Sequence, residues 1–388
     1  MKESRGPIRV GFIIDALRPG AGTENQLILI LRSLDRAKII PSVCCLRDEP
    51  GVVVAEDVRC EVELVGTRKV LSFQGFHGLR KIRNWIRRSR LDFLVTFFGD
   101  SNVLGTLAGS ICGVPVISSR RNIGTGYWHT WRAVQTLRLL NRLTLAFLAN
   151  SEAARISTVE TEGVESDRIT VVPNAVDLRR FRQRKGSEDR KEDRMALGLP
   201  RDGLLIGCVA NLRPIKNLPF LIKAFAKSSN LVSEDFQLLL IGSGPDEQEL
   251  RNLADTLGVA PRVHFLGSRK DVPTILEHLS LGVLTSSVES SPNSIYEYMA
   301  SSLPVVATAV GGVPELVDHG RTGLLVSSRN PDDFATAMSS LVMSMDDRTR
   351  MGEAGRKRIE AEFALLPICE TWVEFFVRMS SKTRRPVR

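Results

Sequence analysis

The chain has 388 residues, of which 43% are hydrophobic and 25% are charged, and its formal net charge is +9. These values are typical of a soluble globular protein, and the length suffices for two domains of ordinary size. No apolar run approaches the ~18 residues that a membrane-spanning helix needs, which argues against an integral membrane protein. The amino-terminal apolar run carries Asp15 and lacks a small-residue cleavage site, so we expect a first strand rather than a signal peptide.

Short apolar runs alternate with amphipathic stretches through the first half of the chain. The predicted strands are 8–14, 41–46, 61–65, 92–97, 114–118, 144–149 and 168–172. The predicted helices are 23–36, 76–89, 101–112, 130–143 and 151–161. This alternation predicts a parallel sheet that is covered by helices.

One of these helices is strongly basic. The segment 77–90 (HGLRKIRNWIRRSR) holds six basic residues and no acid. Its apolar side repeats at helical spacing, through Leu79, Ile82, Trp85 and Ile86. Such a helix can lie peripherally on an anionic membrane, and the alternative is a packed helix with a solvated basic face. We expect no nucleic-acid partner, because ribonucleoprotein-type aromatic motifs and zinc spacings do not occur.

The six cysteines indicate in which cellular compartment the protein is expected. They are Cys44, Cys45, Cys60, Cys112, Cys208 and Cys369, and none of them forms a Cys-x-x-Cys pair. Most stand among apolar residues, as buried free thiols do. We therefore expect reduced core cysteines in a cytoplasmic protein, with the basic helix allowing peripheral contact at the inner membrane face.

The alternation lapses in 179–202, which is dense in both charge signs and has room for one short helix. It then resumes, with strands predicted at 204–210, 236–241, 262–266, 280–285, 304–307 and 323–326. Helices are predicted at 217–228, 246–257, 292–302 and 331–343. The chain thus divides into an N-terminal domain (1–178), a charged boundary segment (179–202) and a C-terminal domain (203–364).

The end of the chain is predicted to be helical. Met351–Phe363 would form one helix, Pro367 would break it, and Ile368–Met379 would form another. The apolar side chains of the last helix need a surface to cover. We therefore expect the segment 365–388 to return to the first domain.

Ligands of open α/β sheets lie beyond the carboxyl ends of strands, so the expected site is a cleft between the two domains. After strand 8–14, Gly20 and Gly22 precede a helix that begins near Thr23. Glycine there lets the backbone approach a ligand, and the free amides of the helix can bind an anion. Simple helix capping is the more common explanation of such a loop.

The strand 204–210 leads into a loop with two cations, Arg213 and Lys216. An arginine fork and a lysine point charge at a strand end can hold a diphosphate. The alternative is that both side chains are solvated.

The strand 280–285 leads into ESSPNSIYE (289–297). Pro292 suits the first turn of a helix that has Ser291 as its N-cap. The amides around Asn293 and Ser294 would then bind phosphate.

Glu289 lies just before this helix and Glu297 lies inside it, so the two carboxylates can contact hydroxyls on separate parts of one extended ligand. A glycosidase-like use of the pair fits less well, because it needs both carboxyl groups to flank one bond.

These segments, with others in the same order, resemble the GT4 family of glycosyltransferases. The resemblance spans nearly the whole chain and is carried by GAGTENQ, ANSEAARI, VVPNAVDLRRF, VANLRPIKN, IGSGPDEQEL, the E-x7-E pattern at 289–297, YMASSLPVVATAVGGVPELV and DHGRTGLLV. It implies the GT-B fold, in which two Rossmann-like parallel-sheet domains face each other across a cleft and a C-terminal helix crosses back to the first. It also implies a retaining enzyme that needs no metal, and no Asp-x-Asp triplet occurs.

The resemblance implies roles for particular residues. Glu289 would be the catalytic residue. Together with the backbone near Asn293 and Ser294, it would form hydrogen bonds with the transferred sugar. Arg213 and Lys216 would contact the diphosphate of a nucleotide-sugar donor, Glu297 the ribose and Gly22 the phosphates from the first domain. The acceptor, a glycan or a lipid-linked saccharide, would lie mainly in the N-terminal domain.

The sequence departs from the family at two places. Many relatives carry arginine where Asn211 stands, and Arg213 can substitute for it. Many carry histidine just after the strand 114–118, where this chain has Ser119, Arg120 and Arg121. We therefore expect the two arginines to meet the donor sugar or an anionic acceptor, and we assign no catalytic role to His129. The glycine pair Gly311–Gly312 would form a tight turn.

Three functions remain open from the sequence. The first is a glycosyltransferase that uses a UDP- or GDP-sugar in polysaccharide or glycolipid biosynthesis. The second is a sugar-nucleotide epimerase of the same fold, which needs no acceptor. The third is a non-catalytic nucleotide-sugar-binding assembly partner, which the intact pair Glu289–Glu297 disfavours.

Overall fold

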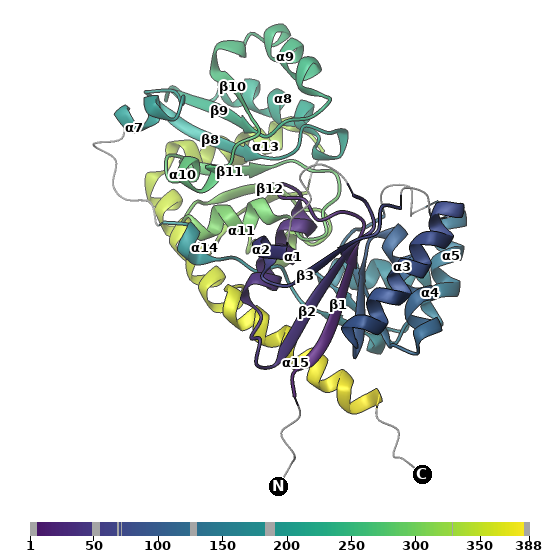
Figure 1. The fold of residues 1–388 in the computed structure, drawn as a ribbon. Coiled ribbons are helices and arrows are strands. Elements are labelled where there is room, and N and C mark those ends of the chain that lie inside the picture. The colour runs from purple at the N-terminus through teal and green to yellow at the C-terminus, as the bar shows by residue number, and fades with distance from the viewer. Residues whose placement is uncertain are drawn as a thin grey trace. The chain divides into compact units, whose positions relative to one another are not determined.

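The computed structural model describes residues 6–48, 55–67, 70, 72–124, 130–182, 191–327 and 329–383. The chain divides into two compact units (Figure 1). Unit 1 comprises Met1–Ala175 together with Leu365–Arg388, and unit 2 comprises Val176–Ala364.

Unit 1 is built on a seven-stranded parallel sheet. Its strands are β1 (Ile8–Ile14), β2 (Ile39–Cys45), β3 (Glu61–Leu64), β4 (Phe93–Phe97), β5 (Val116–Arg120), β6 (Ala146–Ala149) and β7 (Ile169–Val171). They pair in the order β3-β2-β1-β4-β5-β6-β7, and all the pairs are parallel. All seven predicted strands are confirmed.

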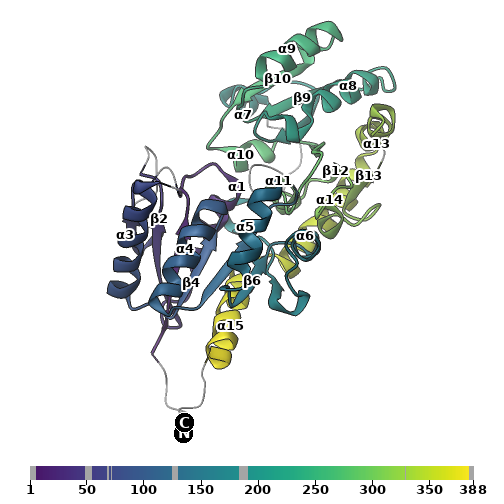
Figure 2. The same cartoon turned by 90° about the vertical axis from the view of Figure 1, so that its right-hand side faces the viewer.

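Helices cover both faces of this sheet (Figure 2). They are α1 (Gly22–Ser33), α2 (Ala55–Val58), α3 (Phe73–Ser89), α4 (Gly99–Cys112), α5 (Trp131–Asn141), α6 (Glu152–Glu162) and α15 (Leu365–Thr383). The alternation of side chains along β1 assigns the faces. Phe12 packs in the core that α1 and α15 share, whereas Ile13 packs in the core under α3 and α4.

The helix α15 belongs to unit 1, as we predicted for the end of the chain. Trp372 and Phe376 contact the ring of Phe12 on β1, with ring centroids 6.1 and 6.4 Å away. The predicted break at Pro367 is wrong: the helices α14 and α15 separate at residues 363–364, and Pro367 lies in the first turn of α15. A proline is tolerated there because the first amides of a helix have no partner within it.

Unit 2 repeats the architecture with six parallel strands, all of them predicted. They are β8 (Leu204–Val209), β9 (Phe236–Ile241), β10 (Val263–Gly267), β11 (Leu281–Leu284), β12 (Val305–Thr308) and β13 (Gly323–Val326). Their order is β10-β9-β8-β11-β12-β13. One face packs against α8 (Leu218–Ser228), α9 (Glu247–Thr256) and α13 (Pro331–Met343). The other packs against α10 (Val272–Leu276), α11 (Asn293–Ala300) and α12 (Val313–Leu316).

The remaining elements are a long helix and short turns. The helix α14 (Met345–Glu362) starts six residues before the predicted Met351, because Ser344 caps it by accepting from the amide of Asp347. The short helices α2, α10 and α12 were not predicted. In the boundary segment the described residues form one short α-helix, α7 (Lys191–Ala196). Over the described ranges, no helix is long and apolar enough to cross a lipid bilayer.

Candidate functional site

The sheet of unit 2 has its topological switch point between β8 and β11, where the strand order reverses direction. Open α/β sheets bind ligands beyond the carboxyl ends of the strands at such a point. Two loops leave the sheet there: residues 210–217 follow β8, and residues 285–292 follow β11. These are the two loops in which the sequence predicted donor contacts.

The two loops meet through an ion pair between Lys216 and Glu289. The Nζ atom of Lys216 lies 2.5 Å from Oε1 of Glu289, and the side chains are 24% and 11% exposed. The hydroxyl of Ser286 donates to the same carboxylate oxygen over 2.6 Å. Both contacts of the Glu289 carboxylate therefore use Oε1, and they fix its orientation.

The backbone around the pair is also tied down. The Thr285 hydroxyl donates to the carbonyl of Lys216 over 3.1 Å, and the Ser287 amide donates to the carbonyl of Ile215 over 2.9 Å. On the other side, the Gly312 amide donates to the carbonyl of Glu289 over 3.0 Å. Gly311 has a φ of +50°, which confirms the predicted tight turn.

Glycines in the segment IGSGP explain how the loop after β8 is held. A Cβ atom on Gly242 would lie 2.0 Å from the carbonyl oxygen of Ala210, and one on Gly244 would lie 2.1 Å from that of Leu212. Only glycine permits this approach. The Leu212 amide then donates to Ser243 over 3.0 Å, which places the next residue, Arg213, at the strand end.

Arg213 is exposed and makes no ion pair with any of the residues that the structure describes. Its backbone lies just before the short 3₁₀ turn Pro214–Lys216. Arg213 and Lys216 thus leave the same loop, one exposed and one held by Glu289. The structure does not test their contact with a diphosphate, which stays a prediction.

The helix α11 begins one residue later than predicted. Pro292 is its N-cap and Asn293 its first residue, whereas the Ser291 hydroxyl bonds the Tyr296 hydroxyl over 2.9 Å instead of capping. The amides of Asn293 and Ser294 lie in the first turn, where the helix itself supplies no acceptors. The helix end that we predicted for an anion site is therefore present, but Pro292 and not Ser291 occupies its N-cap position.

Tyr298 locks α11 onto the two strands of the switch point. Its hydroxyl accepts from the amide of Val209 at the end of β8 over 2.6 Å. Its ring lies against Gly282 of β11, where a Cβ atom would come within 2.4 Å of the ring. The helix that carries Glu297 is therefore fixed to both strands.

Glu297 lies inside α11 and is partly buried. Removal of water raises the pKa of its carboxyl group to about 7, and the charge of Arg180 opposes this shift. A carboxyl group with this pKa is partly protonated at neutral pH. Hydrogen bonds donated by the hydroxyls of a ligand would favour the ionised form of the Glu297 carboxyl group.

In unit 1, the loop after β1 reaches the helix α1 at Gly22, one residue before the predicted start. Gly20 has a φ of +104°, and its amide donates to the Asn25 side chain over 2.9 Å. The exposed Gly22 is therefore the first residue of α1, with Ala21 at the N-cap position.

Sequence reasoning missed a polar cluster at the same edge of unit 1. Asp15, directly after β1, accepts from the amide and the hydroxyl of Ser101 over 2.9 and 2.6 Å. Arg47, after β2, lies 3.9 Å from Asp15 and 3.1 Å from Asp100. Burial raises the pKa of Asp15 to about 6, and burial together with the Asp15 charge raises the pKa of Glu24. Charged residues directly after buried strands were the available signal.

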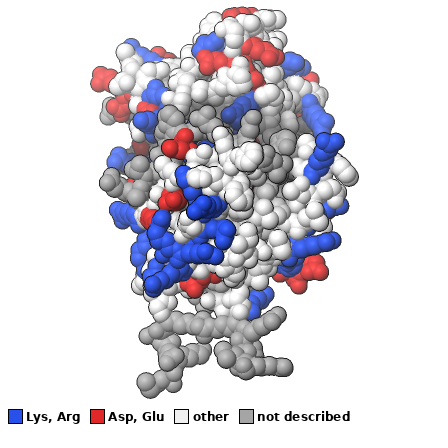
Figure 3. Space-filling model, turned by 45° about the vertical axis from the view of Figure 1, so that its right-hand side comes forward, with Lys and Arg blue, Asp and Glu red and all other residues white. Residues whose placement is uncertain are grey.

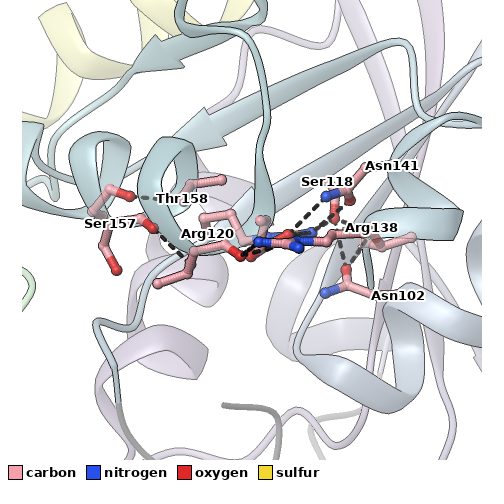
Figure 4. A network of polar contacts seen from close by, with 11 residues as sticks. Asn102, Ser118, Arg120, Arg138, Asn141, Ser157 and Thr158 are labelled. Atoms are coloured by element: carbon pink, nitrogen blue, oxygen red, sulfur yellow. Dashed lines mark hydrogen bonds and ion pairs between the residues drawn. The ribbon is translucent and has the colours of Figure 1, made fainter. Parts of the chain in front are cut away.

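Arg120 does not lie where the sequence suggested. The strand β5 extends to Arg120, two residues beyond the predicted end, so the side chain turns toward α5 and α6 (Figure 4). Its Nε and Nη2 donate to the two carboxylate oxygens of Glu162, both over 2.8 Å, and Nη2 also donates to Asn141 over 3.0 Å. A further bond joins Arg120 to Ser118. We therefore assign Arg120 a structural role in this buried network, in place of the expected contact with a sugar or an acceptor.

Arg121 points to the opposite side of the sheet. Its guanidinium lies 5.7 Å from the centroid of Phe97, and it donates to Asn174 over 2.8 Å and to Ser119 over 3.2 Å. It thus lies at the carboxyl ends of β4, β5 and β7, where contact with a sugar or acceptor stays a prediction. His129 lies outside the described residues.

Two family models match the chain, one on each part. The description Glycosyltransferase Family 4 covers residues 20–180, and Glycosyl transferases group 1 covers residues 189–358. The chain belongs to the GT4-type glycosyltransferases.

Individual relatives agree with this membership. The GT4-type chain is 31% identical over 196 residues to N-acetyl-alpha-D-glucosaminyl L-malate synthase of Bacillus anthracis, and the match covers 50% of each protein. It is 25% identical over 295 residues to UDP-Gal:alpha-D-GlcNAc-diphosphoundecaprenol alpha-1,3-galactosyltransferase of Escherichia coli, covering 72% of this chain and 73% of the relative. The chain spans about half the length of the curated relatives that it matches at 31% identity.

A solved structure shows the same fold. Anabaena Alr3699/HepE, crystallised in complex with UDP and glucose, aligns with a TM-score of 0.84 at 22% identity, over 96% of this chain and all of that one. The two Rossmann-like parallel sheets of the GT4-type chain are those of GT-B glycosyltransferases, which confirms the predicted fold class.

Proposed function

We propose that this chain is a retaining glycosyltransferase that moves a hexose or N-acetylhexosamine from a UDP- or GDP-sugar donor. The observation that carries the proposal is the Lys216–Glu289 pair, held at the switch point next to the amino end of α11. A cation, helix-terminal amides and an oriented carboxylate together suit the diphosphate and the sugar of one donor.

The chemistry requires stabilisation of the leaving group. When the bond between the sugar C1 and the phosphate oxygen breaks, the electron pair stays on the diphosphate. Lys216, Arg213 and the first-turn amides of α11 would stabilise that charge without moving during the reaction. Glu289 would hold sugar hydroxyls, Glu297 the ribose, and Gly22 the phosphates from unit 1. We therefore propose that no metal ion is needed, which chelation with EDTA tests directly.

The acceptor is proposed to be a glycan or a lipid-linked saccharide. The Escherichia coli relative is named for a diphosphoundecaprenol-linked acceptor, which supports this class. We propose a cytoplasmic protein that acts in polysaccharide or glycolipid biosynthesis, with peripheral contact at the inner membrane face.

A thermal-shift screen against nucleoside diphosphates and their sugars tests the donor site. A ligand at a hundredfold excess over its dissociation constant stabilises the protein by about 2.7 kcal/mol. We expect a UDP- or GDP-sugar to raise the melting temperature of the wild type and not of Lys216→Met. Lys223→Met, which removes an exposed lysine of α8, is the matched control and should respond like the wild type. An equal shift in Lys216→Met would contradict the proposed site.

Product analysis then separates the three functions. Transfer of the sugar to an added acceptor, with the anomeric configuration of the donor kept, supports the proposal. A changed sugar nucleotide formed without acceptor identifies an epimerase. Binding with no conversion over a panel of acceptors identifies a non-catalytic partner.

A further inference from the structure

The helix α3 cannot lie on a membrane by the apolar side that its sequence suggested. Ile82, Trp85 and Ile86 are buried in the core that α3 shares with α4 and the sheet, and Trp85 is fully buried. Gly11 of β1 makes room for Trp85, since a Cβ atom there would come within 2.7 Å of the indole. This side of the helix is therefore occupied by unit 1 itself.

The opposite side of α3 exposes two large aromatic residues in its first turns. Phe73 is 97% exposed and Phe76 is 74% exposed. Positions i and i+3 of a helix are neighbours on its surface, so the two rings form one apolar tip. A phenylalanine with nearly its whole surface in water gains nothing from the fold, which points to a partner.

The helix α5 has the same design. Trp131, its first residue, is 74% exposed, and Leu139 is 62% exposed. Both helices follow a strand of the parallel sheet and return beside it. Their amino ends, with the aromatic residues, therefore lie at the carboxyl edge of the sheet, where Asp15 and Arg121 also lie.

Basic side chains follow the aromatic residues along both helices. On α3, Arg80 and Arg87 are exposed, seven and eleven residues after Phe73 and Phe76 respectively. These spacings bring residues back to the same side of a helix. Figure 3 looks onto this side of unit 1 and shows Lys and Arg side chains gathered in the region of α3.

The same spacing recurs on α5, where Arg138 and Arg142 stand seven and eleven residues after Trp131. Neither 73–90 nor 131–143 contains an acidic residue. Arg88 already forms ion pairs with Glu61 and Glu63, over 2.8 and 2.9 Å. Arg80, Arg87 and the α5 arginines all make no ion pair among the described residues, and they contribute basic charge to this surface.

We propose that unit 1 docks on an anionic phospholipid bilayer through the aromatic amino-terminal turns of α3 and α5, with Arg80, Arg87, Arg138 and Arg142 facing the headgroups. Aromatic rings insert at the boundary between headgroups and acyl chains, and each nearby arginine strengthens attraction to anionic lipid roughly fivefold. A polyanion such as duplex DNA would use the arginines and leave the rings exposed. The surface lies on unit 1 alone, so its failure would leave the proposed transfer reaction intact.

Co-sedimentation with vesicles tests this docking surface. We expect the full chain to bind vesicles of 30 mol% phosphatidylglycerol in phosphatidylcholine at low salt, and not pure phosphatidylcholine vesicles. The double variant Phe73→Ser/Phe76→Ser should lose roughly tenfold or more in vesicle affinity, because it removes the inserted rings. Arg80→Gln/Arg87→Gln should lose roughly 25-fold. Melting temperatures checked by circular dichroism establish that both variants are folded.

Two matched variants control for exposure and charge. Leu366→Ser/Val377→Ser removes two exposed apolar residues of α15, and Arg179→Gln/Arg321→Gln removes two exposed arginines of unit 2. Both should bind like the wild type. Absence of wild-type binding at low salt, or equal loss in the controls, would overturn the proposal. So would a loss in the arginine variant with none in the phenylalanine variant, together with binding to duplex DNA, since that pattern identifies a polyanion partner.

Discussion

Two ion pairs at strand ends, one in each unit, differ in how deeply they are buried and in how many oxygens of the carboxylate form contacts. Arg120 and Glu162 in unit 1 have side chains 9% and 7% exposed, and the carboxylate is held by both of its oxygens. Lys216 and Glu289 in unit 2 are more exposed, and the contacts of the carboxylate use one oxygen. A charged pair whose bonding capacity is filled inside the protein serves the fold. A pair with an oxygen left for other donors at a ligand-binding edge can serve a substrate.

The two pairs also differ in what they connect. The Arg120 network joins β5 to α5 through Asn141 and to α6 through Glu162, and Ser118 extends it to Asn102 on α4. The Lys216–Glu289 pair joins two loops at the switch point. Breaking the first should therefore affect stability, and breaking the second should affect activity.

The largest expected effect is on stability, from Glu162→Ala. This change leaves the buried guanidinium of Arg120 without its partner, which typically costs about 3–5 kcal/mol of unfolding free energy. Glu160→Ala, an exposed position on the same helix, should change stability by less than about 0.5 kcal/mol. Urea denaturation of both variants makes the measurement. Equal stability of the two would show that the Arg120 pair is not structural.

The next effect is on activity, from Glu289→Gln. Loss of the oriented carboxylate should lower kcat by about a hundredfold to a thousandfold, as removal of a positioned catalytic group does. The unfolding free energy should change by less than about 1 kcal/mol, because both partners keep access to water. Steady-state kinetics with the donor that the thermal-shift screen selects measures the loss. Glu249→Gln on the surface of α9 should leave turnover unchanged.

Glu297 should make stability depend on pH. Its pKa is about 7 in the folded protein and near 4.5 when unfolded, so the folded state binds more protons between these values. Stability therefore falls as pH rises from 4.5 to 7, by at most roughly 3 kcal/mol. Glu297→Gln should remove that fall, so its advantage over the wild type should be larger at pH 8 than at pH 5. A constant difference across this range would show that the Glu297 carboxyl group is not buried as described.

Asp15 should have the smallest effect, on the acceptor side. Asp15→Asn keeps the shape and leaves an acceptor for Ser101, but removes the charge near Arg47. We expect kcat/KM for the acceptor to fall roughly tenfold with little change in donor affinity. Asp48→Asn, at an exposed neighbouring position, is the control. Equal behaviour of the two variants would remove Asp15 from the site.

The sequence predicted most of the fold because both sheets are buried on two faces. Most of their strands read as apolar runs, and all thirteen were found with errors of at most two residues at their ends. Those small errors mattered at the site. The strand β5 ends two residues later than predicted, so Arg120 is its last residue instead of lying in the loop after it, and its side chain faces the helices.

Other features depend on pairings between distant parts of the chain. Glu162 lies 42 residues from Arg120, and Ser101 lies 86 residues from Asp15, so no local pattern announces either contact. The sequence correctly placed Lys216 and Glu289 in loops at the carboxyl ends of strands, because each residue follows a strand at the switch point. That the two would bind each other became visible only in the folded chain.

The central claim is that a donor diphosphate binds in unit 2, at the loop of Arg213 and Lys216 and the amino end of α11. A crystal structure with UDP-glucose or a GDP-sugar bound tests it most directly. The account predicts phosphate oxygens within hydrogen-bond distance of Lys216 and the amides of Asn293 and Ser294, with sugar hydroxyls on Glu289 and ribose hydroxyls on Glu297. A ligand bound elsewhere, with the Lys216–Glu289 pair untouched, would contradict it.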